Sequence, residues 1–564
     1  MWPRGFGPIF MLISSIARGY IVPRSIAFSS IFCKTARASS VCQATPASMS
    51  TSTSDPMSSS SSSSSIDAYS TVLSKLQTIT QLQRVKSVLS YDQLVFMPKN
   101  ASADRGAQMS ALAALLHEKT TDPSLKEALK LAQNQMVDST DTDAKRLLEI
   151  EQKKLEENER LSTELVAKVA SLEASAYSAW VTAKSNNDFA AFSPILKECF
   201  DTAMEVSTAK RGDSDISLYT KMLDDFETGM SQDRIDEIFG DIRKALVPLI
   251  AQVLESKHKP SSDALFGTFD IDTQKAFCEQ VVTTLGYDIQ SGRIDVSVHP
   301  FSMSFSPSDV RITSRYRSDE WYQGLAAMIH ESGHAMYEQN LGRSATSLDT
   351  ALSMGTHESQ SLFWERHVGL SLPFWNWVTP LLKEKFPGKF DSFSPQDIYG
   401  AVNSVSPSLI RVEADELTYP LHVILRYEIE KDVIGGILDV NDIPERWKRD
   451  MKAFLNVDVP DDSKGCLQDI HWASLAFGYF PTYLIGSATA AQLAHYCRQD
   501  LPMDEMIEKG EFGEIKNWLQ QKVHQHGQRY KSLDALLEDQ FGEKLNPEYF
   551  IKYLDEKYKN LYRL

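Results

Sequence analysis

Two histidines stand four residues apart in the segment AAMIHESGHAMYEQN, and a glutamate follows the first of them. On a helix, His330 and His334 would lie on one face about one turn apart, so both imidazoles could reach one ion. Glu331 would lie about 100° around the helix, where it could contact a water molecule without binding the ion. This is the HEXXH pattern, in which the histidines bind zinc and the glutamate is the general base. Five residues can match by chance in an amphipathic helix, so the surrounding sequence must decide.

A zinc hydrolase needs a third protein ligand and an open fourth position. The segment SMGTHESQSLFWERHVG follows the two histidines, and its Glu358 begins a second helical pattern. A carboxylate from a following helix is the gluzincin arrangement. His357, next to Glu358, and Glu365, two turns later, are competing ligands. Spacing alone favours Glu358 but leaves the other two open.

Composition places the chain among globular proteins. It has 564 residues, of which 42% are hydrophobic and 24% charged, enough for a large core. No run of 18 or more apolar residues is present, so we expect no membrane span. The net charge of -17 argues against nucleic acid as a partner, because a broad basic surface is missing.

The first 65 residues differ from the rest. Up to residue 54 they contain arginines and a lysine but no acidic residue, with many serines and alanines. Such leaders are typical of mitochondrial or plastid transit peptides. The serine run at 58–65 is typical of a flexible linker. We therefore expect residues 1–65 to be a targeting leader and linker, removed or disordered, and residues 66–564 to form a single helical domain.

Two other fates of the leader stay open. The apolar stretch at residues 7–17 could belong to a secretory signal, and Met49 or Met57 could start a cytoplasmic product. Four cysteines outside the leader are widely separated and form no CxxC pair, so we expect free buried thiols (Cys199, Cys278, Cys466 and Cys497).

Helical periodicity dominates the body of the chain. Apolar residues at three- and four-residue spacing predict helices at 104–119, 190–211, 232–257 and 272–285, and one or two long helices over 140–187. The exception is residues 293–316, where two alternating segments flank a Ser/Pro turn, as in a β-hairpin. There Asp309, Arg311 and Thr313 should share one strand face, which is also typical of a solvated edge strand.

Six short motifs occur in a fixed order along the chain: VHPF (298–301), DVRIT (309–313), HESGH (330–334), HESQS (357–361), IRVEAD (410–415) and GCLQDIHW (465–472). With residues 90–118 and FGYFPTY (477–483), this order resembles the carboxypeptidase Taq family of zinc carboxypeptidases. The resemblance covers the chain from about residue 66 to 564. Leu475 departs from it, since a small residue is commoner there.

The resemblance implies a mostly α-helical fold around a deep central cleft, with the small hairpin or sheet beside the zinc site, and a homodimer. It makes His330, His334 and Glu358 the ligands of one zinc ion per chain and Glu331 the catalytic base. Cobalt or manganese could replace zinc. The implied substrates are peptides with a free C-terminus.

A carboxypeptidase must hold the free α-carboxylate of its substrate, and a guanidinium does this best because it can donate two parallel hydrogen bonds. The resemblance points to Arg411 of IRVEAD. An ordinary ion pair with Asp415, one turn later, is the competing role, worth only about 0.3 to 0.5 kcal/mol. Both roles could coexist, with Asp415 orienting the guanidinium.

The reaction also needs a hydrogen-bond donor for the oxygen that becomes negatively charged. From their match to family positions, Tyr483 and His471 come first, while Tyr479 is a second candidate that could equally be a core residue. His299 and Arg311 should shape the wall of the substrate site rather than do chemistry. If the strand at 309–313 is an exposed edge, it could also pair with an extended substrate.

The prediction is a metal-dependent carboxypeptidase that releases C-terminal amino acids by zinc-activated attack of water, with Glu331 as proton acceptor. Two alternatives stay open. A zinc oligopeptidase or endopeptidase on the same scaffold would not require a free C-terminus. An inactive helical binding scaffold is the other, and the intact ligand set argues against it.

Overall fold

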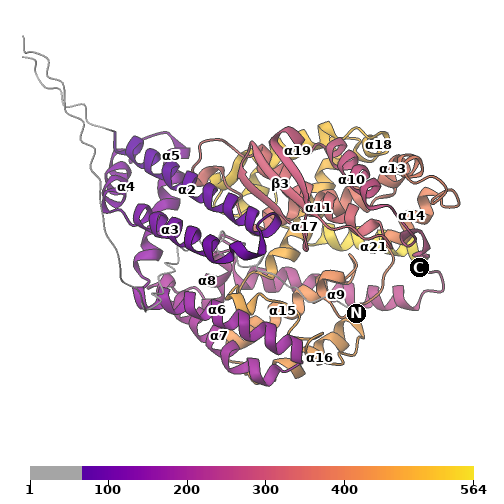
Figure 1. Cartoon of the computed structure of the whole chain (residues 1–564), viewed down its shortest axis with the longest axis horizontal. Coiled ribbons are helices and arrows are strands. Elements are labelled where there is room, and N and C mark those ends of the chain that lie inside the picture. The colour runs from indigo at the N-terminus through magenta and orange to yellow at the C-terminus, as the bar shows by residue number, and fades with distance from the viewer. Residues whose placement is uncertain (1–66) are drawn as a thin grey trace, which may run out of the picture.

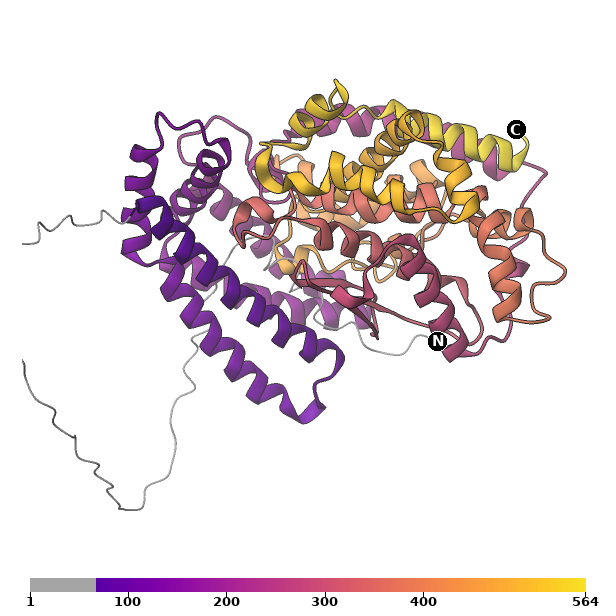
Figure 2. The same cartoon turned by 90° about the horizontal axis from the view of Figure 1, so that it is seen from above.

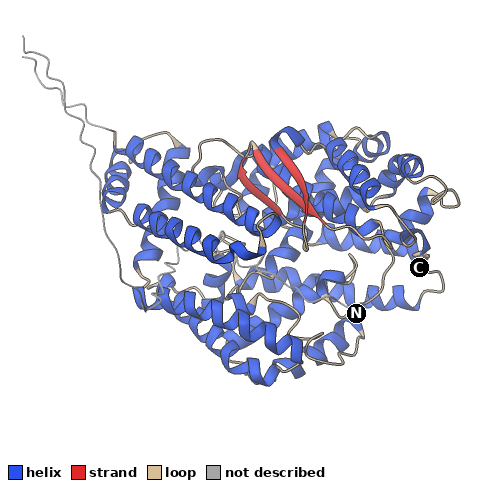
Figure 3. Ribbon diagram, in the orientation of Figure 1, coloured by secondary structure: helices blue, strands red, loops and turns tan. Residues whose placement is uncertain are grey.

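The computed structural model describes residues 67–564, so the expected leader and serine run lie outside the described part of the chain. Helices make up most of it, with one small sheet (Figure 3). The predicted fold class, mostly α with a small sheet, is confirmed. The prediction of a single domain stays a prediction.

The helices before the sheet are α2 (Ala68–Val95), α3 (Ser102–Thr120), α4 (Pro123–Gln135), α5 (Thr142–Glu159), α6 (Thr163–Asn186), α7 (Phe189–Arg211), α8 (Leu218–Asp224), α9 (Gln232–Glu255) and α10 (Ile271–Leu285). The periodicity located α3, α7, α9 and α10 to within two residues at each end. The long pattern at 140–187 is two helices, because Ser162 caps α6 by accepting a hydrogen bond from the Leu165 amide (3.1 Å).

The strands are β1 (Gly292–Val296), β2 (Ser302–Ser306) and β3 (Asp309–Ser314), in the order β1-β3-β2. The predicted hairpin is formed by the antiparallel pair β2 and β3. However, β1 pairs with the other side of β3 in parallel. The expectation that the strand at 309–313 is an exposed edge is therefore wrong: β3 is central and cannot pair with a substrate, and its Thr313 is fully buried.

After the sheet come α11 (Tyr322–Asn340), α12 (Met354–Leu362), the π-helix η5 (Phe363–Gly369), α13 (Leu372–Lys385), α14 (Pro395–Val402), α15 (Tyr419–Ile434), α16 (Ile443–Leu455), α17 (Pro481–Asp500), α18 (Met503–Lys509), α19 (Gly513–Lys522), α20 (Leu533–Phe541) and α21 (Glu548–Tyr562). Short 3₁₀ turns link several of them. One of these, η6 (Arg411–Glu413), carries a predicted site residue.

The main hydrophobic core extends from α6 to α21. The N-terminal helices α2 to α5 lie together at one end of the molecule (indigo and purple in Figures 1 and 2) and have a smaller core that includes Val72, Leu129 and Leu147. The sheet packs against α11, which in turn contacts α12. This arrangement places the HEXXH helix between the sheet and the helix that follows it.

Two composition-based expectations can be compared with the described residues. None of the described helices is both long and apolar enough to cross a membrane. The four cysteines are free and buried, as expected.

Candidate metal centre and active site

The two histidines of the HEXXH segment lie on one face of α11, with ring centroids 4.9 Å apart. With Glu358 on α12 they form a group whose possible ligand atoms all lie within 4.8 Å of one another. Two imidazole nitrogens and one carboxylate oxygen at this spacing fit a divalent transition-metal ion. Sequence and structure therefore agree on His330, His334 and Glu358 as the group that can hold a metal.

Two glycines let the helices approach closely enough to form this group. A Cβ on Gly333, in the HESGH segment of α11, would lie 2.6 Å from Ser361 Cα on α12. A Cβ on Gly486 of α17 would lie 2.7 Å from Glu358 Cβ. Since real side chains do not tolerate such distances, glycine at both positions allows α12 to sit directly between α11 and α17, with Glu358 facing the histidines.

Neighbouring groups orient the two histidines. Nδ1 of His330 lies 2.6 Å from a carboxylate oxygen of Glu365, and Nδ1 of His334 lies 3.1 Å from the His357 carbonyl oxygen and 2.6 Å from His357 Nδ1. With Nδ1 engaged, each ring turns Nε2 towards the cluster. The competing ligands His357 and Glu365 thus contact ligand candidates rather than joining the cluster.

The charges and the burial of the cluster shift the pKa values of its members. Burial alone would lower the pKa of His330, but the bond to Glu365 and further carboxylates raise it to about 9. Burial raises the pKa of Glu365, but the same bond and the positive charges of His330, Arg366 and Lys557 together lower it further, so it stays below its ordinary value. A cation bound here would displace the proton of His330.

Glu331 is buried, with 8% of its surface exposed. Burial raises its pKa to about 7, and a hydrogen bond with Ser302 of β2 acts in the opposite direction. A carboxylate with this pKa can both accept and return a proton near neutral pH. The sheet is thus connected to the HEXXH helix through the glutamate that the sequence assigned to proton transfer.

Arg411 is buried in a group of charged residues. Its Nη2 donates to Asp469 Oδ1 (2.9 Å), and its Nη1 donates to the Tyr419 hydroxyl (3.2 Å). Arg426 donates from Nε to the other oxygen of Asp469 (2.6 Å). One carboxylate therefore serves two guanidinium groups.

Asp415, the expected partner of Arg411, does not form an ion pair with it. Its Oδ1 accepts hydrogen bonds from the amides of Leu417 and Thr418 (3.0 and 2.9 Å), at the start of α15. The orienting carboxylate is Asp469 instead. The prediction failed because Arg411 lies in the short 3₁₀ turn η6, so the four-residue spacing of an α-helix does not apply.

His471, Tyr483 and Tyr479 lie together. Nε2 of His471 is 3.3 Å from the Tyr483 hydroxyl. The Arg411 guanidinium lies over the Tyr483 ring, with its central carbon 4.8 Å from the ring centre. Tyr479 packs edge-on against Phe226 with ring centroids 5.1 Å apart. Burial raises the pKa of Tyr483, and both Arg411 and Glu358 act on it electrostatically. Tyr483 therefore lies near both the arginine cluster and the metal-ligand candidates.

The structure does not bring Arg311 to the ligand cluster. Its guanidinium pairs with Asp309 (2.9 Å) and lies 5.3 Å from the centre of the Tyr91 ring on α2. Asp309 and Arg311 share a strand face, as predicted. His299 lies between β1 and β2, half-buried, and burial lowers its pKa.

Two contributors to the site were missed from sequence. Asp469 lies inside the quoted GCLQDIHW motif, so its position was a usable signal. Arg426 had no signal, because it is one of many residues in the helical pattern of α15. Its complete burial becomes visible only in the fold.

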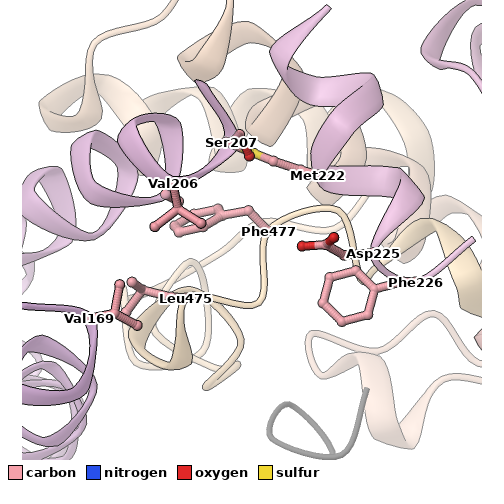
Figure 4. Close-up of a pocket in the computed structure, with 9 residues that line it drawn as sticks. Val169, Val206, Ser207, Met222, Asp225, Phe226, Leu475 and Phe477 are labelled. Atoms are coloured by element: carbon pink, nitrogen blue, oxygen red, sulfur yellow. The ribbon is translucent and has the colours of Figure 1, made fainter. Parts of the chain in front are cut away.

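A small pocket elsewhere contains none of the predicted site residues (Figure 4). It is mostly apolar and lies between α6, α7, α8 and the loop before α17. Leu475 lines it with a positive φ of 52°. A left-handed backbone is easiest for glycine, which lacks a Cβ, so Leu475 is held in a conformation that a side chain disfavours.

Comparison with known proteins identifies the family and several relatives of this chain. A family model described as carboxypeptidase Taq (M32) metallopeptidase matches residues 71–558. Carboxypeptidase 1 of Bacillus subtilis is 38% identical over 492 residues, covering 87% of this chain and 97% of the relative. Thermostable carboxypeptidase 1 of Thermus thermophilus is 35% identical, covering 88% of this chain and 99% of the relative.

The solved structures agree as well. The crystal structure of an M32 carboxypeptidase from Deinococcus radiodurans R1 superposes with a TM-score of 0.85 at 32% identity, covering 88% of this chain and all of that one. These matches favour the predicted carboxypeptidase over the oligopeptidase and the inactive scaffold. The chain belongs to the carboxypeptidase Taq (M32) family of metallopeptidases and is a metal-dependent carboxypeptidase.

Proposed function

We propose that the enzyme uses one zinc ion per chain, held by His330, His334 and Glu358, and that Arg411 binds the α-carboxylate of the peptide. Two neutral imidazoles and one carboxylate form a donor set suited to zinc, with cobalt or manganese as substitutes. When bound, such an ion supplies Lewis-acid chemistry that polarises a carbonyl and acidifies water. The remaining steps belong to side chains of the protein.

The observation that carries the substrate assignment is the shared carboxylate of Asp469. It faces Arg411 and Arg426 at 2.9 and 2.6 Å, and the adjacent His471 is held neutral because burial lowers its pKa well below the ordinary value. This group therefore has one excess positive charge in a buried place. A substrate carboxylate would neutralise it, which favours peptides with a free C-terminus.

Glu331 is assigned the proton transfers. It accepts a proton from the attacking water and returns it to the nitrogen of the departing C-terminal residue, so that the amine leaves neutral. Tyr483 and His471 are assigned as donors to the carbonyl oxygen while it carries negative charge. Their support is the position of Tyr483 near both Arg411 and Glu358.

Other predicted contacts act around this centre. Tyr479, which packs beside Tyr483 with ring centroids 5.4 Å apart, is assigned to the wall near the terminal residue. His299 and Arg311 are assigned to the wall on the sheet side, where the Arg311 guanidinium lies over the Phe305 ring of β2, 4.8 Å from the ring centre. None of these three is assigned a proton transfer.

A matched pair of peptides tests the role of Arg411. A peptide with a free C-terminus should be shortened one residue at a time. The same peptide with an amidated C-terminus should react at least about a hundredfold more slowly. The reason is that an amide cannot neutralise the excess positive charge of the buried group of Arg411, Arg426 and Asp469, and leaving a buried charge uncompensated typically costs about 3 to 5 kcal/mol. Mass spectrometry of a timed digest measures both rates.

Variants make this test specific. Arg411→Ala should slow the free acid and remove most of the difference between the peptides. Arg446→Ala, which removes a partly buried, ion-paired arginine (14% exposed), should keep the difference. Equal cleavage of both peptides by the unmodified enzyme would refute the assignment of Arg411.

We also propose that the enzyme is a homodimer and that it is located in a mitochondrion or plastid. The support is the family resemblance for the dimer and the acid-poor leader for the compartment. Light scattering coupled to size exclusion would give twice the chain mass for a dimer and the single chain mass otherwise. A fluorescent reporter fused to residues 1–65 should enter the organelle, and a cytosolic or secreted reporter would reject the proposal.

A further inference from the structure

The first amides of α12, the helix that carries Glu358, are capped from a distant segment. The Met354 amide donates to the Phe226 carbonyl oxygen (2.9 Å). The next amide, of Gly355, donates to Oε2 of Glu227 (2.9 Å). The chain between α8 and α9 thus supplies acceptors for two successive amides of α12.

Glu227 also holds the residue that caps the third amide. The Ser353 hydroxyl donates to Oε1 of Glu227 (2.7 Å) and accepts from the Thr356 amide (3.0 Å). Both oxygens of this one carboxylate are therefore used at the same helix end. The amides of an α-helix N-terminus otherwise lack partners, so this contact completes the cap.

Glu227 is fully buried, and within residues 67–564 no lysine, arginine or histidine forms an ion pair with it. Burying a carboxylate without a cation is costly. The compensating interactions are the hydroxyl, the amide and the positive end of the helix dipole. Such a residue fixes the helix end, because a displacement of α12 would leave its buried carboxyl oxygens without hydrogen-bond donors.

The position of that helix end determines where Glu358 lies. Glu358 follows Gly355 by less than one turn, and its sideways position is already limited by Gly333 and Gly486. At its other end α12 continues into the π-helix η5, whose winding differs from that of an α-helix. The N-terminal cap therefore fixes the end of α12 from which the Glu358 side chain follows within one turn.

We propose that Glu227 is a positioning residue of the metal centre, which holds α12 so that the Glu358 carboxylate meets His330 and His334. This inference rests on the proposed role of Glu358 as the third ligand. It assigns to Glu227 no contact with metal or substrate. The adjacent Phe226, which lines the small pocket in Figure 4, also packs edge-on against Tyr479.

The test is the zinc affinity of the purified full-length enzyme, measured by competition with a chromogenic chelator. Glu227→Gln keeps the shape of the side chain, but its amide group cannot accept both hydrogen bonds. We expect zinc affinity to fall about tenfold, in the range found for residues that orient ligands. The matched control is Glu430→Gln, which alters another fully buried glutamate with no contact to α12 and should leave the affinity within twofold.

A double variant distinguishes a positioning role of Glu227 from general destabilisation of the protein. In Glu358→Ala, adding Glu227→Gln should cause no further loss of zinc affinity, because the ligand through which Glu227 acts is missing. Ser353→Ala breaks the same cap from the other side and should weaken zinc binding in the same direction. It also serves if Glu227→Gln does not fold.

The outcomes distinguish this inference from the proposed ligand set. Unchanged zinc affinity in Glu358→Ala would overturn the ligand set itself. A loss in Glu358→Ala with unchanged affinity in both Glu227→Gln and Ser353→Ala would overturn only the role of Glu227. An equal loss in Glu430→Gln, or an undiminished effect in the Glu358→Ala background, would also overturn it.

Discussion

The carboxylate of Glu365 lies 2.6 Å from Nδ1 of His330, one of the proposed metal ligands. Such a partner fixes which nitrogen of the imidazole is available and how the ring is turned. Glu365 reaches this position from the π-helix η5, while Glu358 lies on the preceding α-helix. Two glutamates seven residues apart can therefore have different roles, one as ligand and one as its support.

Substitution of each glutamate separates these roles. Glu358→Ala should lose most of the zinc, whereas Glu365→Ala should bind it about 10- to 100-fold more weakly while retaining the site. Elemental analysis after dialysis against chelators of graded strength measures both. Full zinc content in Glu358→Ala combined with loss in Glu365→Ala would instead identify Glu365 as the third ligand.

Glu331→Gln should abolish most turnover without removing the metal. The amide keeps the size of the side chain but cannot accept the proton, and general base catalysis typically contributes about 10²- to 10⁴-fold. Single-turnover rates and zinc content should be measured on the same preparation. Glu338→Gln, on the same helix and bonded to His357 (3.1 Å), is the control, and a larger loss there would move the proton acceptor to Glu338.

The predictions that agree with the structure depend mainly on patterns within single helices. His330, His334 and Glu331 belong to one helix, so their geometry follows from spacing alone. A helical pattern and a known ligand arrangement favoured Glu358, but His357 and Glu365 stayed open until the family resemblance was added. The helix boundaries agree for the same reason, since apolar periodicity reports the buried face of each helix directly.

Contacts between distant segments could not be predicted in this way. Asp469 is 58 residues from Arg411, whereas spacing suggested the nearby Asp415. The alternating segments and the turn correctly indicated the hairpin of β2 and β3, but the parallel partner β1 and the central place of β3 were missed. Alternation records which face is buried and carries no information on which strand lies alongside.

The close crossing of α11 and α12 can be tested at Gly333. Gly333→Ala would place its Cβ 2.6 Å from Ser361 Cα and 2.7 Å from the Gln360 carbonyl oxygen, and overpacking of this kind typically costs about 1 to 3 kcal/mol. We expect lower unfolding free energy and weaker zinc binding. Gly240→Ala, in α9 with no atom near the added methyl group, should instead stabilise the protein by up to about 1 kcal/mol. Equal effects of the two changes would contradict the crossing.

The last prediction concerns pH and the buried carboxyl group of Glu430. It accepts hydrogen bonds from the Trp472 indole (2.8 Å), the Tyr219 hydroxyl (2.7 Å) and the Gly478 amide (2.9 Å), and so holds the loop that follows His471. Burial raises its pKa from 4.5 to about 7, although the three hydrogen bonds oppose this shift. The folded protein therefore prefers the protonated form.

A carboxyl group whose pKa is raised in the folded state makes the protein less stable as pH rises. The contribution of Glu430 is fully present below the unfolded pKa and is lost as pH rises through about 7. Glu430→Gln cannot titrate, so the difference in unfolding free energy between the unmodified enzyme and this variant should shrink by about 2 kcal/mol between pH 5.5 and 8.5. Urea unfolding at both pH values measures it, with the exposed Glu445→Gln as a control whose difference should stay constant. A difference that stays constant or grows would mean that the three donors keep Glu430 ionised throughout, and that hydrogen bonding outweighs burial at this residue.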